Sequence, residues 1–155
     1  MTGRSSSPEM FVSYAHEDKD ILENLEPHLA LLVRQEKIRL WHDGEILAGA
    51  DWEHEITQRL ESADIILLLV SANFIASEYC WGVEMRRAIE RHGLGEARVI
   101  PLIVRPCLWE SAPFAGLQSL PRGAKAVTLW DDRDEALRDV ASGIAQVAET
   151  MARSE

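Results

Sequence analysis

The sequence predicts an α/β domain in which a five-stranded parallel sheet carries helices on both faces. Apolar runs of strand length alternate with segments whose apolar residues recur every three or four positions, the pattern of alternating strands and helices. The run DIILLLV at residues 64–70 is apolar on both faces, as in a central parallel strand that is covered on both sides. Because crossovers between parallel strands are right-handed, we expect the doubly wound strand order 2-1-3-4-5.

A single domain accounts for the chain apart from its first residues. The 155 residues are 46% hydrophobic, which is enough for one core. We expect residues 1–9, which include the run SSSP, to form a disordered lead-in and residues 10–152 to form the domain.

The first strand is expected at Met10 to Tyr14, followed by an amphipathic helix. Asp18 has the position and chemistry of the N-cap of this helix. Pro27 predicts a kink or a late helix start, because proline removes a backbone donor and clashes with the preceding turn. The apolar positions that share one helix face are Ile21, Leu25, Leu29 and Leu32.

A short second strand and a second helix flank a loop that contains glycine. The strand is expected at Ile38 to Trp41, and the loop is HDGEILAGAD at residues 42–51, with Gly44 and Gly49. The helix is expected from Asp51, because apolar residues then recur at every fourth position, at Trp52, Ile56 and Leu60.

The second half of the chain predicts two further strands and two further helices. The third helix follows the central strand and ends near Gly93, with Trp81, Met85, Ala88 and Ile89 on one stripe. The run RVIPLIV at residues 98–104 is a buried strand in which Pro101 removes one ladder donor, so we expect a bulge there or bonding on one side. The last strand is expected at Ala126 to Leu129. The last helix buries one face, formed by Leu137, Val140, Ile144, Val147 and Met151.

Charge and composition exclude several classes of function. Lys and Arg total 16 against 26 Asp and Glu, so the formal net charge is −10, which opposes binding to nucleic acid or to anionic membranes. The longest aliphatic run, Ile65 to Val70, is far shorter than the roughly 20 residues of a membrane helix. The chain lacks a secretory signal and a CxxC motif, so we expect Cys80 and Cys107 to be reduced thiols in a cytoplasmic protein.

The sequence contains no established metal, nucleotide or nucleophile motif. His54 and Glu55 are not followed by the second histidine of HExxH, and GLG at residues 93–95 lacks the third glycine of a dinucleotide fingerprint. Neither GxSxG nor a histidine near Cys80 indicates an activated nucleophile. The acidic run DDRDE at residues 131–135 is better explained by capping of the last helix than by cation binding. We therefore expect no metal and no resident cofactor.

The fold directs attention to Glu84. In a doubly wound sheet, ligands bind beyond the carboxyl ends of the strands, and this selects the loops SYAHED, HDGEILAGAD and SANFIASEY. Glu84 follows the last of these loops and has Trp81 three residues before it on the predicted helix. A carboxylate beside an indole near this cleft is a candidate catalytic group. The alternative, which the pattern alone favours, is a solvated surface residue paired with Arg87 or Arg91.

Several segments, in order, resemble those of a bacterial TIR (Toll/interleukin-1 receptor homology) domain. They are FVSYAHEDKD, WHDGEILAGADWEHEI, ADIILLLVSANFIASEYCWGVEM and the later IPLIV and CLW, and the resemblance runs from about Met10 to Met151. It implies a flavodoxin-like fold and two possible activities. Some members of this family cleave NAD⁺ at the nicotinamide–ribose bond, and others are adaptors that only self-associate.

The resemblance also implies the residues of the site. It places the catalytic carboxylate at Glu84, which follows Ser77, Tyr79 and Cys80 as in the enzymatic members. Many relatives have a Trp four residues before this Glu, whereas Trp81 is three before it, so which aromatic residue lines the pocket stays open. The substrate-binding residues that the resemblance implies are Tyr14, Ala15, His16, Asp43, Trp52 and Trp81.

The resemblance further implies NAD⁺ as a substrate and other TIR protomers as partners. Self-association is expected through the mobile loop after the second strand, at Gly44, Glu45, Ile46 and Leu47, of which Ile46 and Leu47 offer an exposed apolar contact. A fused sensor domain outside this chain is expected to trigger a bacterial defence or stress response. The alternative is a non-enzymatic module that acts through TIR–TIR contacts alone.

Overall fold

The computed structural model describes residues 7–41 and 46–153. A parallel sheet of four strands in the order β2-β1-β3-β4 forms the centre of this part of the chain. β3 therefore lies between two other strands, as predicted. The strands are β1 (Glu9–Ser13), β2 (Arg39–Trp41), β3 (Ile65–Val70) and β4 (Arg98–Ile103).

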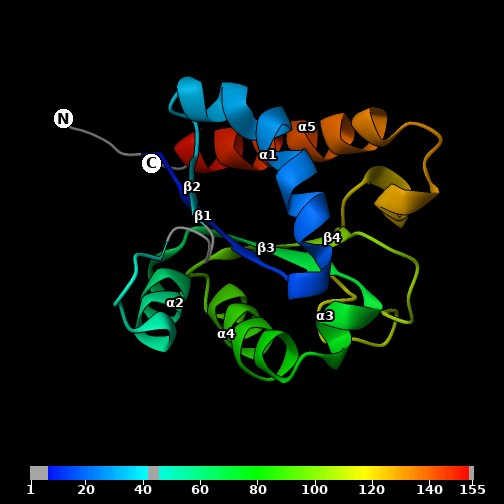
Figure 1. Ribbon diagram of the computed structural model, residues 1–155. Coiled ribbons are helices and arrows are strands. Elements are labelled where there is room, and N and C mark those ends of the chain that lie inside the picture. Colours follow the sequence, from blue (N-terminus) through cyan, green and yellow to red (C-terminus); the bar gives the residue numbers. More distant parts are fainter. Residues whose placement is uncertain (1–6, 42–45, 154–155) are drawn as a thin grey trace.

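Helices cover both faces of the sheet (Figure 1). On one face, α1 (Lys19–Arg34) packs beside α5 (Arg133–Arg153). The other face carries α2 (Trp52–Ser62), α3 (Ala72–Ala76) and α4 (Arg86–Gly93). The doubly wound, flavodoxin-like α/β fold is thus confirmed.

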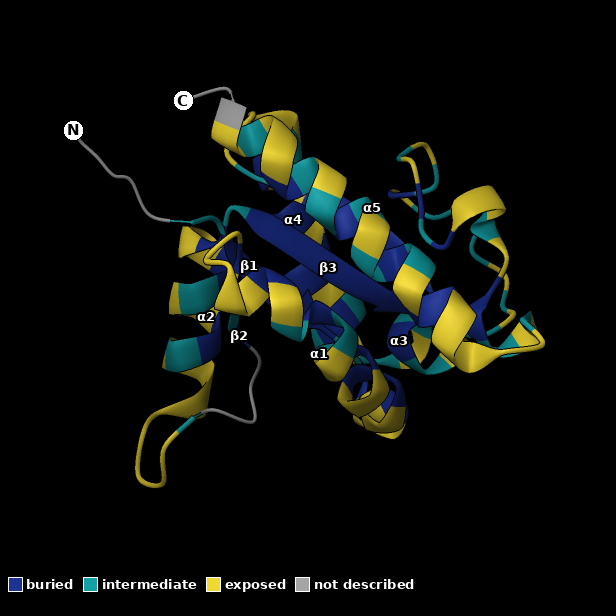
Figure 2. Cartoon of the chain, turned by 90° about the horizontal axis from the view of Figure 1, so that it is seen from above, coloured by how far each residue is buried: buried dark blue, intermediate teal, exposed yellow. Residues whose placement is uncertain are grey.

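The pleat of the strands divides the core into two layers, because successive side chains point to opposite faces. In β1, Met10 and Val12 pack with α1 and α5, whereas Phe11 packs with the opposite helices. β3 is buried along its whole length between the two helix layers, while α1, α2 and α5 expose their outer faces (Figure 2). This double burial explains why β3 reads as a continuous apolar run rather than an alternating one.

The last helix docks as its apolar spacing predicts. Leu137, Val140 and Ile144 are almost completely buried against the sheet, and Val147 packs at the margin of the same cluster. At its start, Asp132 Oδ1 accepts a hydrogen bond of 2.9 Å from the Asp134 backbone N–H. The acidic run at residues 131–135 therefore serves the helix terminus, as predicted.

The predicted fifth strand is wrong, and the outer edge of β4 explains why. Val127–Leu129 forms a 3₁₀ turn, and the isolated bridge to this edge of β4 comes from Leu120, which accepts from the Ile103 N–H and donates to the Pro101 carbonyl, both at 2.8 Å. Pro101 has no N–H, and the Val99 N–H donates to His92 Nδ1 at 3.1 Å. No N–H of residues 99–103 on this edge is left to start a ladder with a fifth strand.

Two details of α1 also differ from the sequence-based expectation. The helix runs without a break from Lys19 to Arg34 and contains Pro27, so a late start is wrong. Packing of its apolar face outweighs the one lost backbone hydrogen bond. Asp18 does occupy the N-cap position, but its side chain makes no capping hydrogen bond and serves the network described below.

Three general findings concern only the described residues. None of their helices is both long and apolar enough to cross a membrane. They hold no group of three or more His, Cys, Asp or Glu side chains placed to bind a metal ion. Neither Cys80 nor Cys107 forms a disulfide with another described residue.

Candidate active site

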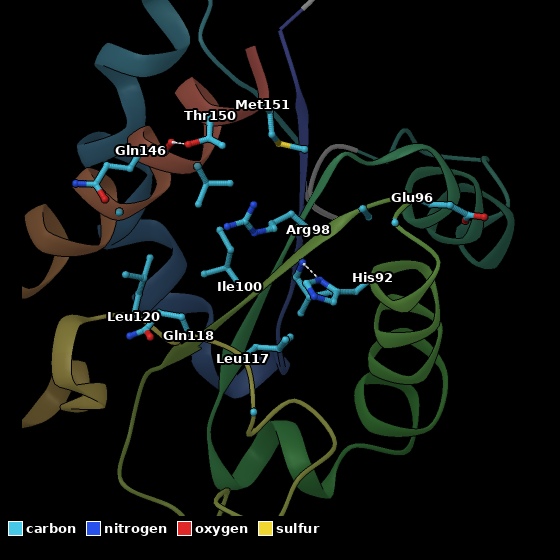
Figure 3. Close-up of a pocket in the computed structure, with 16 residues that line it drawn as sticks. His92, Glu96, Arg98, Ile100, Leu117, Gln118, Leu120, Gln146, Thr150 and Met151 are labelled. Carbon is cyan, nitrogen blue, oxygen red and sulfur yellow. Dashed lines mark hydrogen bonds between the residues drawn. The ribbon is translucent and has the colours of Figure 1, made fainter. Parts of the chain in front are cut away.

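Two cavities of the described part of the chain, among others, differ in size and place. The larger of these two, about 830 Å³, lies beside the outer edge of β4 between α5 and the end of α4, with Arg98 pointing into it (Figure 3). The smaller, about 590 Å³, lies beyond the carboxyl ends of β1 and β3. The smaller cavity occupies the position at which doubly wound sheets bind their ligands.

The residues that line the smaller cavity come from two of the three loops selected by the fold, together with the helices that follow. Five of the predicted site residues, Tyr14, Ala15, His16, Trp52 and Glu84, surround it. Its remaining lining residues are Glu17, Asn73, Ala76, Ser77, Tyr79 and Cys80. Asp43, Gly44 and Glu45, which the sequence analysis also assigns to the site or its loop, lie outside the described residues.

Glu84 is a buried group and not a solvated surface residue. Only 5% of it is exposed, and its Oε1 accepts a hydrogen bond of 2.6 Å from the Ser13 hydroxyl at the end of β1. Arg87 bonds to Glu61 and Glu90, and Arg91 donates to the carbonyls of Leu60 and Ala63 at 2.8 Å. Burial of an ionisable carboxyl group at a cavity wall costs free energy, and such groups cluster at functional sites.

A π-helical segment, Cys80–Met85, explains which neighbours of Glu84 reach the cavity. In an α-helix, Trp81 at i−3 would lie on the same face as Glu84. Hydrogen bonding from i to i+5 widens the turn, so the residues four and five positions before Glu84, Cys80 and Tyr79, share its face instead. Trp81 is not among the described residues that line the cavity, and its ring packs edge-on against Phe114 at 6.4 Å. The structure therefore does not place Trp81 at this cavity.

Tyr79 and Trp52 form an aromatic wall opposite the first loop. Their ring centroids lie 4.8 Å apart with an interplanar angle of 51°. Burial and the nearby Glu84 carboxylate raise the pKa of Tyr79 to about 12, so its phenol stays protonated at neutral pH. Cys80 completes this side by donating from Sγ to the Tyr14 carbonyl at 3.3 Å.

A second buried carboxylate holds the two loops that form the cavity mouth. Asp18 is completely buried, and it accepts hydrogen bonds from the Ser71 hydroxyl and from Arg105 Nε, the latter at 2.8 Å. Ser71 also accepts from the Phe74 N–H at 3.1 Å and so caps α3. This network joins the ends of β1, β3 and β4 and stabilises the backbone that carries Ala15 and His16.

Ile46 and Leu47, the two apolar loop residues that were expected to be exposed, differ in their exposure to solvent. Leu47 is 80% exposed, as predicted, whereas Ile46 is partly buried and packs against the core cluster that includes Phe11 and Trp41. The sequence-based expectation for Ile46 is therefore wrong, because its side chain completes the packing of the domain itself. Leu47 remains the apolar contact that this loop presents to solvent.

This arrangement suits one type of chemistry in particular. A buried carboxylate stabilises positive charge far better than a carboxylate in water. The aromatic rings of Trp52 and Tyr79 offer flat surfaces for a planar or sugar ring. Glu17 also lines the cavity but is exposed, and the buried Asp18 is not among the lining residues, so Glu84 is the buried carboxylate of the described cavity wall.

Sequence reasoning missed two of the groups around Glu84. Ser13 is the last residue of β1 and the first residue of the loop SYAHED, and its inward direction follows only from the strand register with β3. Tyr79 was noted as part of the motif but not as a lining residue, because the π-helical winding has no signal in the apolar spacing.

Comparisons with known proteins agree with this geometry. Residues 10–141 match the family model described as the TIR domain. The protein y4lF of Sinorhizobium fredii is 48% identical over 147 residues, which cover 95% of this chain and 46% of y4lF, so the chain spans about half of that relative.

Two solved structures share the fold. The TIR domains of the activated Roq1 resistosome, which directly recognises the pathogen effector XopQ, have a TM-score of 0.53 and 21% identity over 92% of this chain and 84% of theirs. A prokaryotic SEFIR domain has a TM-score of 0.50 and 15% identity, over 88% of this chain and 91% of its own.

Proposed function

Because the chain belongs to the TIR domain family, we propose that it is an NAD⁺ glycohydrolase that cleaves the nicotinamide–ribose bond with Glu84 as its catalytic carboxylate. The observation that carries this proposal is the buried Glu84 carboxylate in the wall of the cavity at the strand ends. A surface carboxylate would have favoured a purely associative role. The substrate is NAD⁺ itself, so the reaction needs no separate cofactor.

One carboxylate suffices for this reaction. Ordinary glycosidases use two carboxyl groups, because the leaving oxygen must be protonated. The nicotinamide of NAD⁺ is already cationic, so it takes the electron pair of the broken C–N bond and leaves as a neutral molecule. The positive charge then develops on the ribose, where Glu84 stabilises the oxocarbenium-like transition state. Water that adds to this carbon and loses a proton gives ADP-ribose, and an internal nucleophile gives a cyclic isomer.

The donors for the pyrophosphate come from the first loop. The whole chain carries a formal net charge of −10, so the site needs local donors for an anionic substrate. His16 lines the cavity and is the first residue of the 3₁₀ turn His16–Asp18, which leads into α1. The first N–H groups of a helical segment lack partners within it and favour an anion. We assign Tyr14, Ala15 and His16 to this end of the substrate, and we keep Asp43, outside the described residues, as a proposed binding residue.

We also propose that the enzyme works as an assembly of TIR protomers. Leu47 presents an apolar side chain to solvent on the loop after β2, and this loop leads directly into Trp52 at the cavity. A neighbouring protomer that covers Leu47 would lie beside Trp52 at the cavity and so contribute to the site. We further propose a fused sensing region as the trigger and a cytoplasmic role in bacterial defence or stress response.

The test is nicotinamide release from NAD⁺ by the purified chain, measured over a wide range of protein concentrations. We expect release per molecule to rise with concentration, because assembly completes the site. Release proportional to concentration would contradict the assembly proposal but leave the enzymatic one intact. No release at any concentration would leave the non-enzymatic adaptor as the function, since the exposed Leu47 would still supply a contact.

A further inference from the structure

A short hydrogen bond joins the end of β1 to the buried carboxylate of the site. The Ser13 hydroxyl lies 2.6 Å from Glu84 Oε1, although 71 positions separate the two residues in the chain. Ser13 is completely buried and only 5% of Glu84 is exposed, so bulk water competes little for this bond. A hydrogen bond to an ionised group is stronger than a neutral one, and its loss leaves a buried acceptor without that donor. The contact is therefore strong enough to fix how the carboxylate lies.

The strand β1 holds the donor of this bond in place. Ser13 is the last residue of the strand, and its backbone pairs with Leu68 in the buried strand β3. Glu84 instead lies in the π-helical segment Cys80–Met85, and its carboxylate is carried by a side chain with three rotatable bonds. A donor on a paired strand thus restrains a carboxylate whose own side chain has several staggered rotamers.

We propose that Ser13 is a positioning residue for the reaction, because its hydroxyl holds one oxygen of the Glu84 carboxylate so that the other faces the ribose carbon on which charge develops. This inference rests on the proposed function and deepens it, since it adds a residue that acts only through Glu84. Ser13 is not among the described residues that line the cavity, so it has no direct contact with substrate. A hydroxyl has one proton to donate and therefore restrains Oε1 and not Oε2. Electrostatic stabilisation is most effective when the charged group is held in its reactive position before the reaction begins.

Ser13→Ala tests the proposal because it removes the hydroxyl and leaves the charge of Glu84 in place. We expect kcat for nicotinamide release to fall about ten- to a hundredfold, the effect of one lost hydrogen bond to a charged group, with KM for NAD⁺ changed by less than about twofold. Ser13→Thr keeps a hydroxyl on a side chain that suits a strand and should restore kcat to within about threefold of the wild type. Ser119→Ala is the matched control, since it removes another buried serine hydroxyl that lies outside the cavity lining, and it should leave kcat unchanged.

The same substitution in the Glu84→Gln background separates a positioning role from a structural one. If Ser13 acts through the charge of Glu84, Ser13→Ala should lower kcat by less than about twofold once that charge is absent. A loss of stability would instead lower kcat by the same factor in both backgrounds. Melting curves of all variants identify those that are folded at the assay temperature, and Ser13→Cys, with a weak donor of similar size, replaces Ser13→Ala if the latter is not folded.

Every other result overturns the proposal. Wild-type kcat in folded Ser13→Ala would show that the carboxylate needs no help from Ser13. Equal fractional losses of kcat with and without the charge of Glu84, or a folded Ser13→Thr as slow as Ser13→Ala, would assign the hydroxyl to packing alone. Absence of nicotinamide release by the wild type would instead reject the proposed function, and the role of Ser13 with it.

Discussion

Glu84→Gln is the most informative perturbation of the site. The substitution keeps the shape of the side chain and removes only its charge. The Ser13 hydroxyl, 2.6 Å from Oε1, can still donate to the amide oxygen of Gln, so the buried hydrogen bond survives. The variant therefore separates the electrostatic role of the group from its structural role.

The structure sets the size of the two effects. Glu84→Gln replaces the charge-assisted hydrogen bond from Ser13 by a neutral one, which lowers the free energy of unfolding by about 1 kcal/mol. Part of this loss is offset, because the neutral Gln side chain costs less to bury than a carboxylate that is only 5% exposed. We thus expect the free energy of unfolding to change by about 1 kcal/mol or less. Loss of one well-placed electrostatic group typically costs about 10²–10³ in kcat, or about 2.7–4 kcal/mol in the barrier.

The assay compares nicotinamide release by wild type and Glu84→Gln at matched concentration, with melting curves for both. Glu90→Gln is the control, because Glu90 pairs with Arg87 at the surface and its loss should change the free energy of unfolding by less than about 1 kcal/mol without changing release. A drop in turnover with unchanged melting supports the catalytic role. Equal release by wild type and Glu84→Gln would refute the reasoning and favour the adaptor function.

Further predictions concern the fold, the assembly and the pH response. Ile144→Ala should lower the free energy of unfolding by about 2–5 kcal/mol, because Ile144 is completely buried between α5 and the sheet; an unchanged denaturant midpoint would contradict this docking. Leu47→Asp should abolish the concentration dependence of nicotinamide release without changing the melting temperature, whereas Leu94→Asp, another exposed leucine, should change neither. The fold raises the pKa of Tyr79 from 10.0 to about 12, so its contribution to stability is present below pH 10 and is lost as the pH rises towards 12. Melting curves of Tyr79→Phe should therefore fall less steeply with pH than those of the wild type across that window.

Much of the site follows from the order of strands and loops. Once β1 and β3 are recognised as neighbouring parallel strands, the loops after them must meet at one edge of the sheet. That rule brings Tyr14, Ala15 and His16 near the segment that carries Glu84, and the cavity at this edge contains them. Residues after strand ends are predictable because the direction of parallel strands leaves no other arrangement.

The environment of Glu84 was not predictable in the same way. Its spacing from Arg87 and Arg91 fits a surface ion pair as well as a catalytic group. Only the structure shows that Arg87 and Arg91 bond elsewhere and that Glu84 lies under the Ser13 hydroxyl. The pairing depends on contacts between segments 71 residues apart, and local spacing carries no information about them.

Apolar periodicity by itself determined the architecture of this protein. Strand runs and helical stripes report which faces are buried, and burial of apolar surface is the dominant favourable term in folding. The tertiary structure alone decided the details that depend on individual hydrogen bonds. His92, Pro101 and Leu120 leave the edge of β4 without donors for a fifth strand, and the π-helical segment turns Tyr79, not Trp81, towards the cavity. Such choices involve single hydrogen bonds between distant residues, each worth about 1 kcal/mol, which is too small and too specific to leave a pattern in the sequence.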